Sequence, residues 1–134
     1  MRAEEYGFEV VVAAALPEAE ARLRALLAEE GFGVLTEIDV RRTLKEKLGA
    51  EFPPYRILGA CNPRLAQRAL EAEPAVGLLL PCNVVVEEAA GGTRIRLLNP
   101  KALFGAEAGV LGEVATEAEE RLRRVAARLE GSST

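Results

Sequence analysis

The sequence predicts a single α+β domain over residues 1–130, followed by a polar tail at 131–134. Two kinds of apolar pattern support this fold class. Several segments carry apolar side chains at every second position, which is typical of strands with one buried face. Other segments carry them every three or four positions, which is typical of amphipathic helices. At 134 residues, the chain is long enough to bury a core without a metal or a disulfide.

The first third of the chain predicts two strands with a helix between them. A strand is expected at 6–14, where Phe8, Val10 and Val12 share one parity. Pro17 suits the first turn of the helix, and Gly31 suits its end. A second strand is expected at 32–40. One face of this strand is predicted to consist of Phe32, Val34, Thr36, Ile38 and Val40.

The middle of the chain predicts a short helix, a strand and another helix. Asp39 suits the N-cap of the short helix, which is expected at 41–48. After a break at two prolines, a strand is expected at 55–61. Asn62 and Pro63 then suit the N-cap and the first position of the next helix, which is expected to end at Pro74.

The last third predicts an interrupted strand, a further strand and a long helix. The interrupted strand is expected at 76–80 and again at 84–86, because a proline breaks the apolar run between them. A glycine turn leads into a strand at 93–98. The clearest helix of the chain is expected at about 107–129, where its apolar stripe should lie across the sheet.

Composition excludes several classes of function. The chain has no His, which removes the commonest acid-base residue and metal ligand. Its only serines, Ser132 and Ser133, lie in the polar tail, so a serine hydrolase is excluded. No apolar run is long enough to span a bilayer, and the acidic start does not resemble a signal peptide. We therefore expect a cytoplasmic protein that is not associated with a membrane.

Charge argues against a nucleic-acid partner. The net charge is −4, and the basic residues are scattered among acidic ones. The densest basic cluster, within 121–128, is expected to balance nearby glutamates on a solvated helix face. Abundant Glu and Arg with few Asn and Gln are typical of a thermophilic protein, although a GC-rich genome would also favour Arg.

Two cysteines lie in similar settings and mark the candidate site. Cys61 precedes Asn62, and Cys82 precedes Asn83, each beside a proline. The candidate ligand-binding residues are Cys61, Cys82, Asn62, Asn83, Tyr55 and Asp39. For Tyr55, core packing is the simpler explanation, and for Asp39 it is helix capping.

The motifs resemble those of a known family. The segments Gly31–Asp39, Tyr55–Pro63 and Leu80–Val86 are similar to the bacterial and archaeal family called domain of unknown function 302, and the resemblance extends from the first strand to the last helix. It implies a curved, mainly antiparallel sheet with helices packed on one face, in a β-α-β(4)-α-like order with extra short helices. It also implies a homodimer, but no established activity.

The reactivity and separation of the two cysteines leave alternatives open. Cys61 precedes a capped helix, whose N-terminus would favour a thiolate and lower its pKa. A buried core residue is the simpler explanation for each cysteine, and more so for Cys82, which lies next to a structural proline. If the strands ending at Cys61 and Cys82 run parallel, both thiols lie at one sheet edge. If these strands are antiparallel or not adjacent, the thiols lie about 20 Å apart, one strand length.

Three functions remain open at this point. The first is a small-ligand or metal-binding module near the two cysteines, where soft metals such as Cu(I) or Zn would need further ligands. The second is a thiol redox enzyme, in which Cys61 attacks and Cys82 resolves, although no C-x-x-C motif is present. The third is a structural or interaction protein whose cysteines only fill the core. The sequence leaves open whether the protein is an enzyme, and it indicates no cofactor.

Overall fold

The computed structural model describes residues 1–3, 5–104 and 109–131. Its strands are β1 (Arg2–Ala3), β2 (Gly7–Val12), β3 (Gly33–Asp39), β4 (Tyr55–Cys61), β5 (Cys82–Ala89) and β6 (Gly92–Leu98). Its α-helices are α1 (Leu16–Glu29), α2 (Val40–Leu48), α3 (Pro63–Ala72), α4 (Pro100–Phe104) and α5 (Val110–Gly131), and the 3-10 helix η1 spans Pro74–Leu79. This is the predicted α+β fold.

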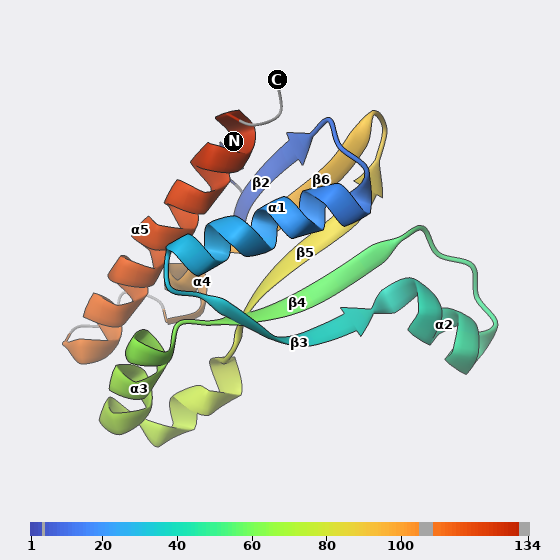
Figure 1. Cartoon of the computed structure of the whole chain (residues 1–134). Helices are drawn as coiled ribbons and strands as arrows, with labels where there is room; N and C mark the ends of the chain where they lie inside the picture. Colours follow the sequence, from blue (N-terminus) through green and yellow to red (C-terminus); the bar gives the residue numbers. More distant parts are fainter. Residues whose placement is uncertain (4, 105–108, 132–134) are drawn as a thin grey trace.

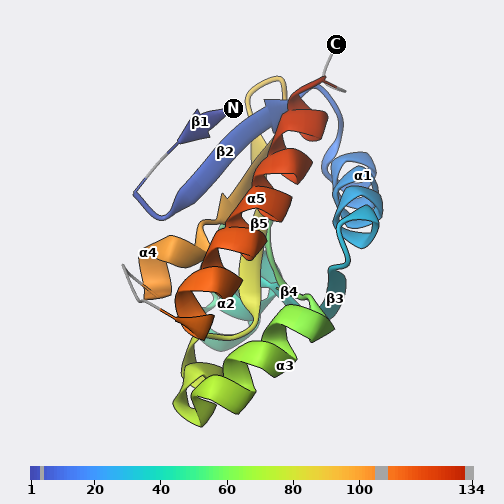
Figure 2. The same cartoon turned by 90° about the vertical axis from the view of Figure 1, so that its left-hand side faces the viewer.

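The strands form one sheet in the order β1-β2-β6-β5-β4-β3, and every neighbouring pair is antiparallel. Helices α1 and α5 pack against each other and against the same face of the sheet, as Figure 1 and Figure 2 show from two sides. The long C-terminal helix therefore lies across the sheet, as its apolar stripe predicts.

The core lies between the sheet and these two helices. Alternate side chains of β2, β5 and β6 point into it, which confirms the predicted parity of Phe8, Val10 and Val12. From the other side, α1 and α5 bury the leucines of their apolar stripes, including Leu23, Leu27 and Leu122. Burial of these stripes stabilises both helices more than their intrinsic propensity does.

Most of the predicted elements are confirmed, some of them to the residue. Strand β4 has the predicted bounds of 55–61, and helix α3 begins at Pro63 with Asn62 as its N-cap. The backbone N–H of Arg42 donates to Asp39 Oδ1 at 2.9 Å, so Asp39 caps α2 as expected. Helix α5 is described from Val110; the first expected residues of this helix, 107 and 108, lie outside the described residues.

The strand predicted at 76–80 is wrong. Residues Pro74–Leu79 form the 3-10 helix η1, and the next strand begins at Cys82 rather than at 84. Prolines at 74 and 81 flank this stretch, no strand among the described residues pairs with it, and Glu73 caps the 3-10 turn through its carboxylate. The apolar run is not all core, because Leu78 is 90% exposed.

The alternation predicted for 32–40 is interrupted by an irregularity in β3. The register against β4 shifts between Val34 and Thr36, so the alternation of faces is reversed for the residues that follow. Val34 consequently packs against the core, whereas Ile38 is 48% exposed. The two residues therefore do not share one buried face as expected.

Helix α2 projects from the rest of the molecule at the far end of β3 and β4 (Figure 1). None of its residues is buried. It is held by its Asp39 cap and by Gly49, which adopts the left-handed conformation at its end. This arm has no covering element among the described residues of the chain.

Candidate functional site

The fold brings the two cysteines together. Cys61 is the last residue of β4, Cys82 is the first residue of β5, and the Cα of Cys82 lies opposite that of Ala60 in the antiparallel register. The expectation that antiparallel pairing would separate the thiols by a strand length is therefore wrong. It assumed that a strand ended at Cys82, whereas the helical segment before it makes Cys82 the start of a strand.

Both thiols line a small cavity where β4 and β5 meet helices α3, α4 and α5. The cavity measures about 30 Å³. Its lining residues are Phe32, Ala60, Cys61, Asn62, Leu65, Ala66, Ala69, Leu80, Pro81, Cys82, Pro100, Phe104, Val114 and Ala118. Apart from the thiols and Asn62, the side chains of this thiol pocket are hydrocarbon. Both cysteines are free and partly buried.

Asn62 fixes the wall of the thiol pocket. Its side chain is 9% exposed, accepts from the backbone N–H of Leu65 at 3.3 Å, and donates through Nδ2 to the carbonyl of Glu30 at 3.3 Å. The first contact caps α3, and the second attaches that cap to the end of α1. Both polar atoms of the Asn62 side chain therefore form hydrogen bonds that stabilise the fold.

Burial makes both thiols weaker acids than a free cysteine. Desolvation raises the pKa of Cys61, and desolvation together with the nearby Cys61 raises the pKa of Cys82 to about 11. The expected lowering of the Cys61 pKa by the α3 N-terminus is therefore wrong: the pKa is raised, and burial is the cause. Both thiols are consequently protonated at neutral pH.

The other three candidate residues lie away from the thiol pocket. Asn83 is exposed and lines a separate hollow with Tyr6 and Arg96. Tyr55 lies at the opposite end of β4, where its ring meets Phe52 edge-on. Asp39 caps α2. Of the six candidates, the structure brings together Cys61, Cys82 and Asn62.

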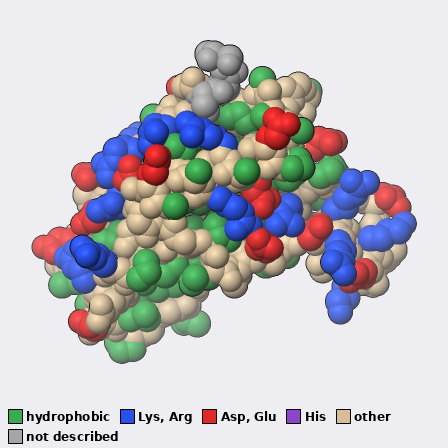
Figure 3. All heavy atoms as spheres, viewed as in Figure 1, with side chains coloured by type: hydrophobic (Ala, Val, Ile, Leu, Met, Phe, Trp, Pro, Cys, Tyr) green, Lys and Arg blue, Asp and Glu red, His purple; other side chains and the backbone are tan. Residues whose placement is uncertain are grey.

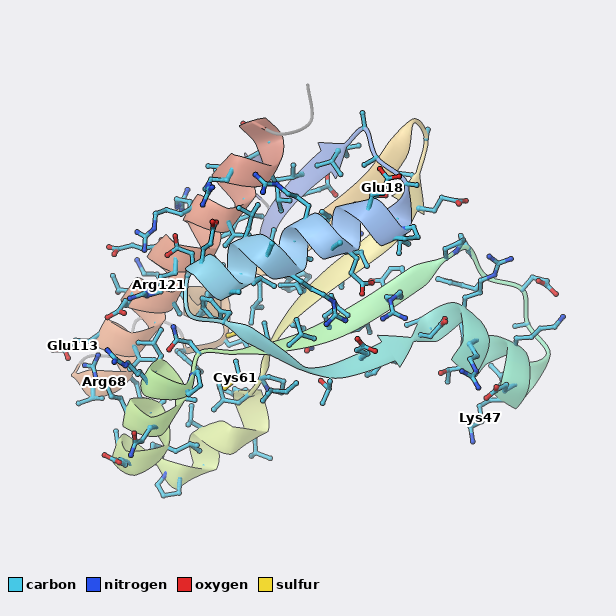
Figure 4. The ribbon with its side chains drawn as sticks, viewed as in Figure 1. Glu18, Lys47, Cys61, Arg68, Glu113 and Arg121 are labelled. Carbon is cyan, nitrogen blue, oxygen red and sulfur yellow. The ribbon has the colours of Figure 1, made fainter. Side chains whose placement is uncertain are left out.

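A larger groove adjoins the thiol pocket, and sequence reasoning missed it. It measures about 640 Å³. Its lining residues are Ala28, Glu29, Gly31, Asn62, Pro63, Arg64, Leu65, Arg68, Glu117 and Arg121. Asn62 and Leu65 belong to both linings, so the two hollows share a wall. Figure 4 shows Cys61, Arg68 and Arg121 in the same region, around α3 and α5.

Three arginines from two helices face this arginine groove. Arg121 donates to the Glu30 carbonyl at 3.1 Å and to Glu117 at 3.0 Å, and Arg68 donates to Glu113 at 2.9 Å. Within the described residues, the Arg64 side chain has neither an ion pair nor a hydrogen bond. The only sequence signal was the spacing of Arg64 and Arg68, which places them one helical turn apart.

The described residues contain neither a cluster of metal-ligating side chains nor a membrane-spanning helix. No group of three or more His, Cys, Asp or Glu side chains is arranged to hold a metal ion in 1–3, 5–104 and 109–131. None of the helices in that part of the chain is long and apolar enough to cross a membrane.

Comparison with known proteins agrees with the fold. The family model described as "Domain of unknown function DUF302" matches residues 8–129. The chain belongs to the DUF302 family. A crystal structure of an uncharacterized conserved DUF302 protein from Bacillus stearothermophilus superposes with a TM-score of 0.84 at 37% identity, covering 92% of this chain and 98% of that one. No curated protein matches this DUF302 chain.

Proposed function

We propose that this DUF302 protein is a small-ligand-binding module whose site is the thiol pocket. The observation that carries the proposal is the meeting of Cys61 and Cys82 at a single apolar cavity, although they come from different strands. Packed cores contain few voids, and each one weakens the surrounding contacts. We therefore expect a small molecule to bind in this void, which is lined by the only two thiols of the chain.

Size and lining favour a small apolar guest. A volume of about 30 Å³ exceeds the roughly 10–15 Å³ that one water molecule needs. A water would find few partners here, because both polar atoms of Asn62 are already engaged. Apolar cavities stay dry and take up apolar molecules or noble-gas atoms.

The thiol redox enzyme is the weaker alternative. Such an enzyme needs an accessible thiolate, whereas burial raises the pKa of both thiols. A reducing compartment such as the cytoplasm would keep both thiols free. A soft metal ion would have to displace two tightly held protons and obtain further ligands from outside the described residues. A purely structural role predicts that nothing enters the cavity.

Xenon binding tests the proposal directly. Methyl NMR spectra recorded under increasing xenon pressure should show saturable shifts for Leu65, Leu80 and Val114, which line the cavity. Ala66→Val, which adds two methyl groups at the lining, should weaken xenon binding by at least about fivefold. Ala72→Val makes the same change at an exposed position of the same helix and should leave binding unchanged.

The outcomes separate the alternatives. If the methyl shifts instead rise linearly with xenon pressure across the whole protein, xenon does not bind in the cavity. The cysteines would then be core residues only, and the proposal would be overturned. A mass loss of two hydrogens after mild peroxide treatment, with rapid alkylation at neutral pH, would support the redox enzyme instead. One equivalent of Cu(I) retained through desalting, and lost after thiol alkylation, would support a metal module.

A second copy of the chain is the partner that we propose for α2. Apolar side chains are exposed on α2 and beside it, at Leu48 of α2, Ile38 of β3 and Phe52 of the segment after α2, which are 74%, 48% and 39% exposed. Figure 3 shows Lys and Arg side chains on this projecting helix. Helix α2 carries four basic residues and one acidic one, whereas the chain as a whole has a net charge of −4. A basic, partly apolar arm therefore complements the acidic surface of another copy.

Sedimentation velocity tests this homodimer. The wild type should sediment as a species of twice 14.4 kDa. Leu48→Glu should shift it toward the monomer, because a carboxylate at a buried contact is costly. Leu78→Glu is the matched control, since Leu78 is also exposed but lies on η1. A dimer that survives Leu48→Glu, or a wild-type monomer, would contradict the proposal.

A further inference from the structure

The thiol pocket and the arginine groove share Asn62 and Leu65 and differ sharply in chemistry. The pocket is small and lined by hydrocarbon and two protonated thiols. The groove is much larger, open and lined by three guanidinium groups and two carboxylates. Two adjoining hollows of this kind match a ligand with a small apolar end and a charged end.

We infer that the ligand of the thiol pocket carries an anionic group, a carboxylate or a phosphate, which the arginine groove holds through Arg64 and Arg68. This inference rests on the proposed function and names the class of ligand. The apolar end occupies the cavity between Cys61 and Cys82. The anionic end lies in the groove, beside Asn62 and Leu65, which line both hollows.

The balance of charge in the groove favours an anion. Of its two carboxylates, Glu117 is paired with Arg121 at 3.0 Å, and Glu29 is paired with Arg128 of α5. Arg121 is also engaged with the Glu30 carbonyl, so it serves the packing of α1 against α5. Arg68 pairs with Glu113 at an exposed site, where such pairs contribute little and exchange readily.

Arg64 supplies the strongest evidence for an anionic ligand. Within residues 1–3, 5–104 and 109–131, its guanidinium has no ion pair, yet it lines the groove one helical turn from Arg68. Two guanidinium groups at this spacing can both reach one carboxylate or phosphate. Hydrogen bonds of this charged type are about twice as strong as neutral ones.

Butyrate, monobutyl phosphate and 1-butanol form a matched set of probes, because they share a short tail and differ in the head group. We expect at least one of the two anions to bind at least about tenfold more tightly than butanol at low salt, as one charge-assisted contact would provide. The tighter of the two identifies the head group. All three probes should shift the methyl signals of Leu65 and Leu80.

Variants of the two arginines test whether they bind the anionic group of the ligand. The double variant Arg64→Gln/Arg68→Gln should bind the anions no more than about twofold better than butanol, while its affinity for butanol stays unchanged. As a control, Arg22→Gln removes one positive charge from an exposed position on α1 that does not line the groove, and it should change nothing. Arg121 is left intact because it holds α1 and α5 together.

Failure of this inference differs from failure of the proposed function. If butanol and xenon bind in the thiol pocket but neither anion binds more tightly, the anionic head group is wrong and the pocket remains a binding site. An anion preference that persists in the double variant also contradicts the inference. If neither butanol nor xenon enters the pocket, the proposed function itself is wrong.

Discussion

The thiol of Cys82 couples the thiol pocket to the stability of the fold. Burial raises its pKa from the ordinary 9.0 to about 11, so the folded chain holds this proton more tightly than the unfolded chain does. The resulting stabilisation is fully present below pH 9.0 and is lost as the pH rises toward 11. Its size is on the order of 2 kcal/mol.

We therefore expect a Cys82→Ala variant to lose less stability than the wild type between pH 9.0 and 11. Urea unfolding at several pH values measures the difference. Every other ionisable group is present in both proteins, so the difference between their stability curves reports on Cys82. Parallel stability curves for the two proteins would mean that Cys82 ionises as freely in the folded chain as in the unfolded one.

At the scale of elements, Gly59 fixes how β3, β4 and the segment before β5 fit together. A Cβ at this position would lie 2.2 Å from Thr36 Oγ1 and 2.7 Å from Pro81 Cγ. Thr36 follows the register shift of β3, and Pro81 lines the thiol pocket. The absence of a side chain at Gly59 therefore allows β3 and Pro81 to approach the centre of β4.

Gly59→Ala should lower the free energy of unfolding by about 1–3 kcal/mol, because the added Cβ would collide with the Thr36 side chain and with the Pro81 ring. Gly33→Ala is the matched control, since a Cβ at Gly33 meets nothing within 4 Å and this variant should be close to neutral. Urea unfolding checks both. Equal stabilities for the two variants would show that Pro81 or Thr36 yields easily, and that the fit at Gly59 is loose.

The elements also show what a local pattern predicts well. Alternation at Phe8, Val10 and Val12 predicted β2 because one face of that strand is buried along its whole length. Asn62 and Pro63 predicted the start of α3 because capping is decided within one turn. Such signals depend on neighbours in the sequence, so the sequence contains them.

Other features depend on contacts between distant segments, and the local pattern could not provide them. The apolar stretch Val76–Leu80 suits a strand as well as a short helix, and only the absence of a partner strand decides against the strand. Because this stretch is helical, β5 begins at Cys82, and that places Cys82 close to Cys61 at the end of β4. The arginine groove requires α3 to meet α5, and its residues are indistinguishable in sequence from ordinary charged surface residues.

At the scale of the whole molecule, ion pairs connect elements that the core also joins. Arg56 on β4 pairs with Glu20 on α1 at 2.6 Å, and Arg24 on α1 pairs with Glu37 on β3. Arg124 on α5 binds Glu30, which lowers the pKa of that carboxyl. Networks of ion pairs are typical of thermophilic proteins. The thermophilic origin itself stays a prediction from the sequence.

The thiol pocket lies where the main layers of this molecule meet, since β4, β5, α3, α4 and α5 all contribute to its lining. A guest there contacts the sheet and the helices at once and would stabilise the folded chain by mass action. This cavity is, on our proposal, a binding site rather than a packing defect.

A crystal of the protein equilibrated with xenon gas tests that claim most directly, because anomalous scattering locates each bound atom. We predict one well-occupied xenon position bounded by Cys61, Cys82 and Leu65, which is lost in Ala66→Val and kept in Ala72→Val. An empty thiol pocket in a crystal that binds xenon at another site would contradict the claim.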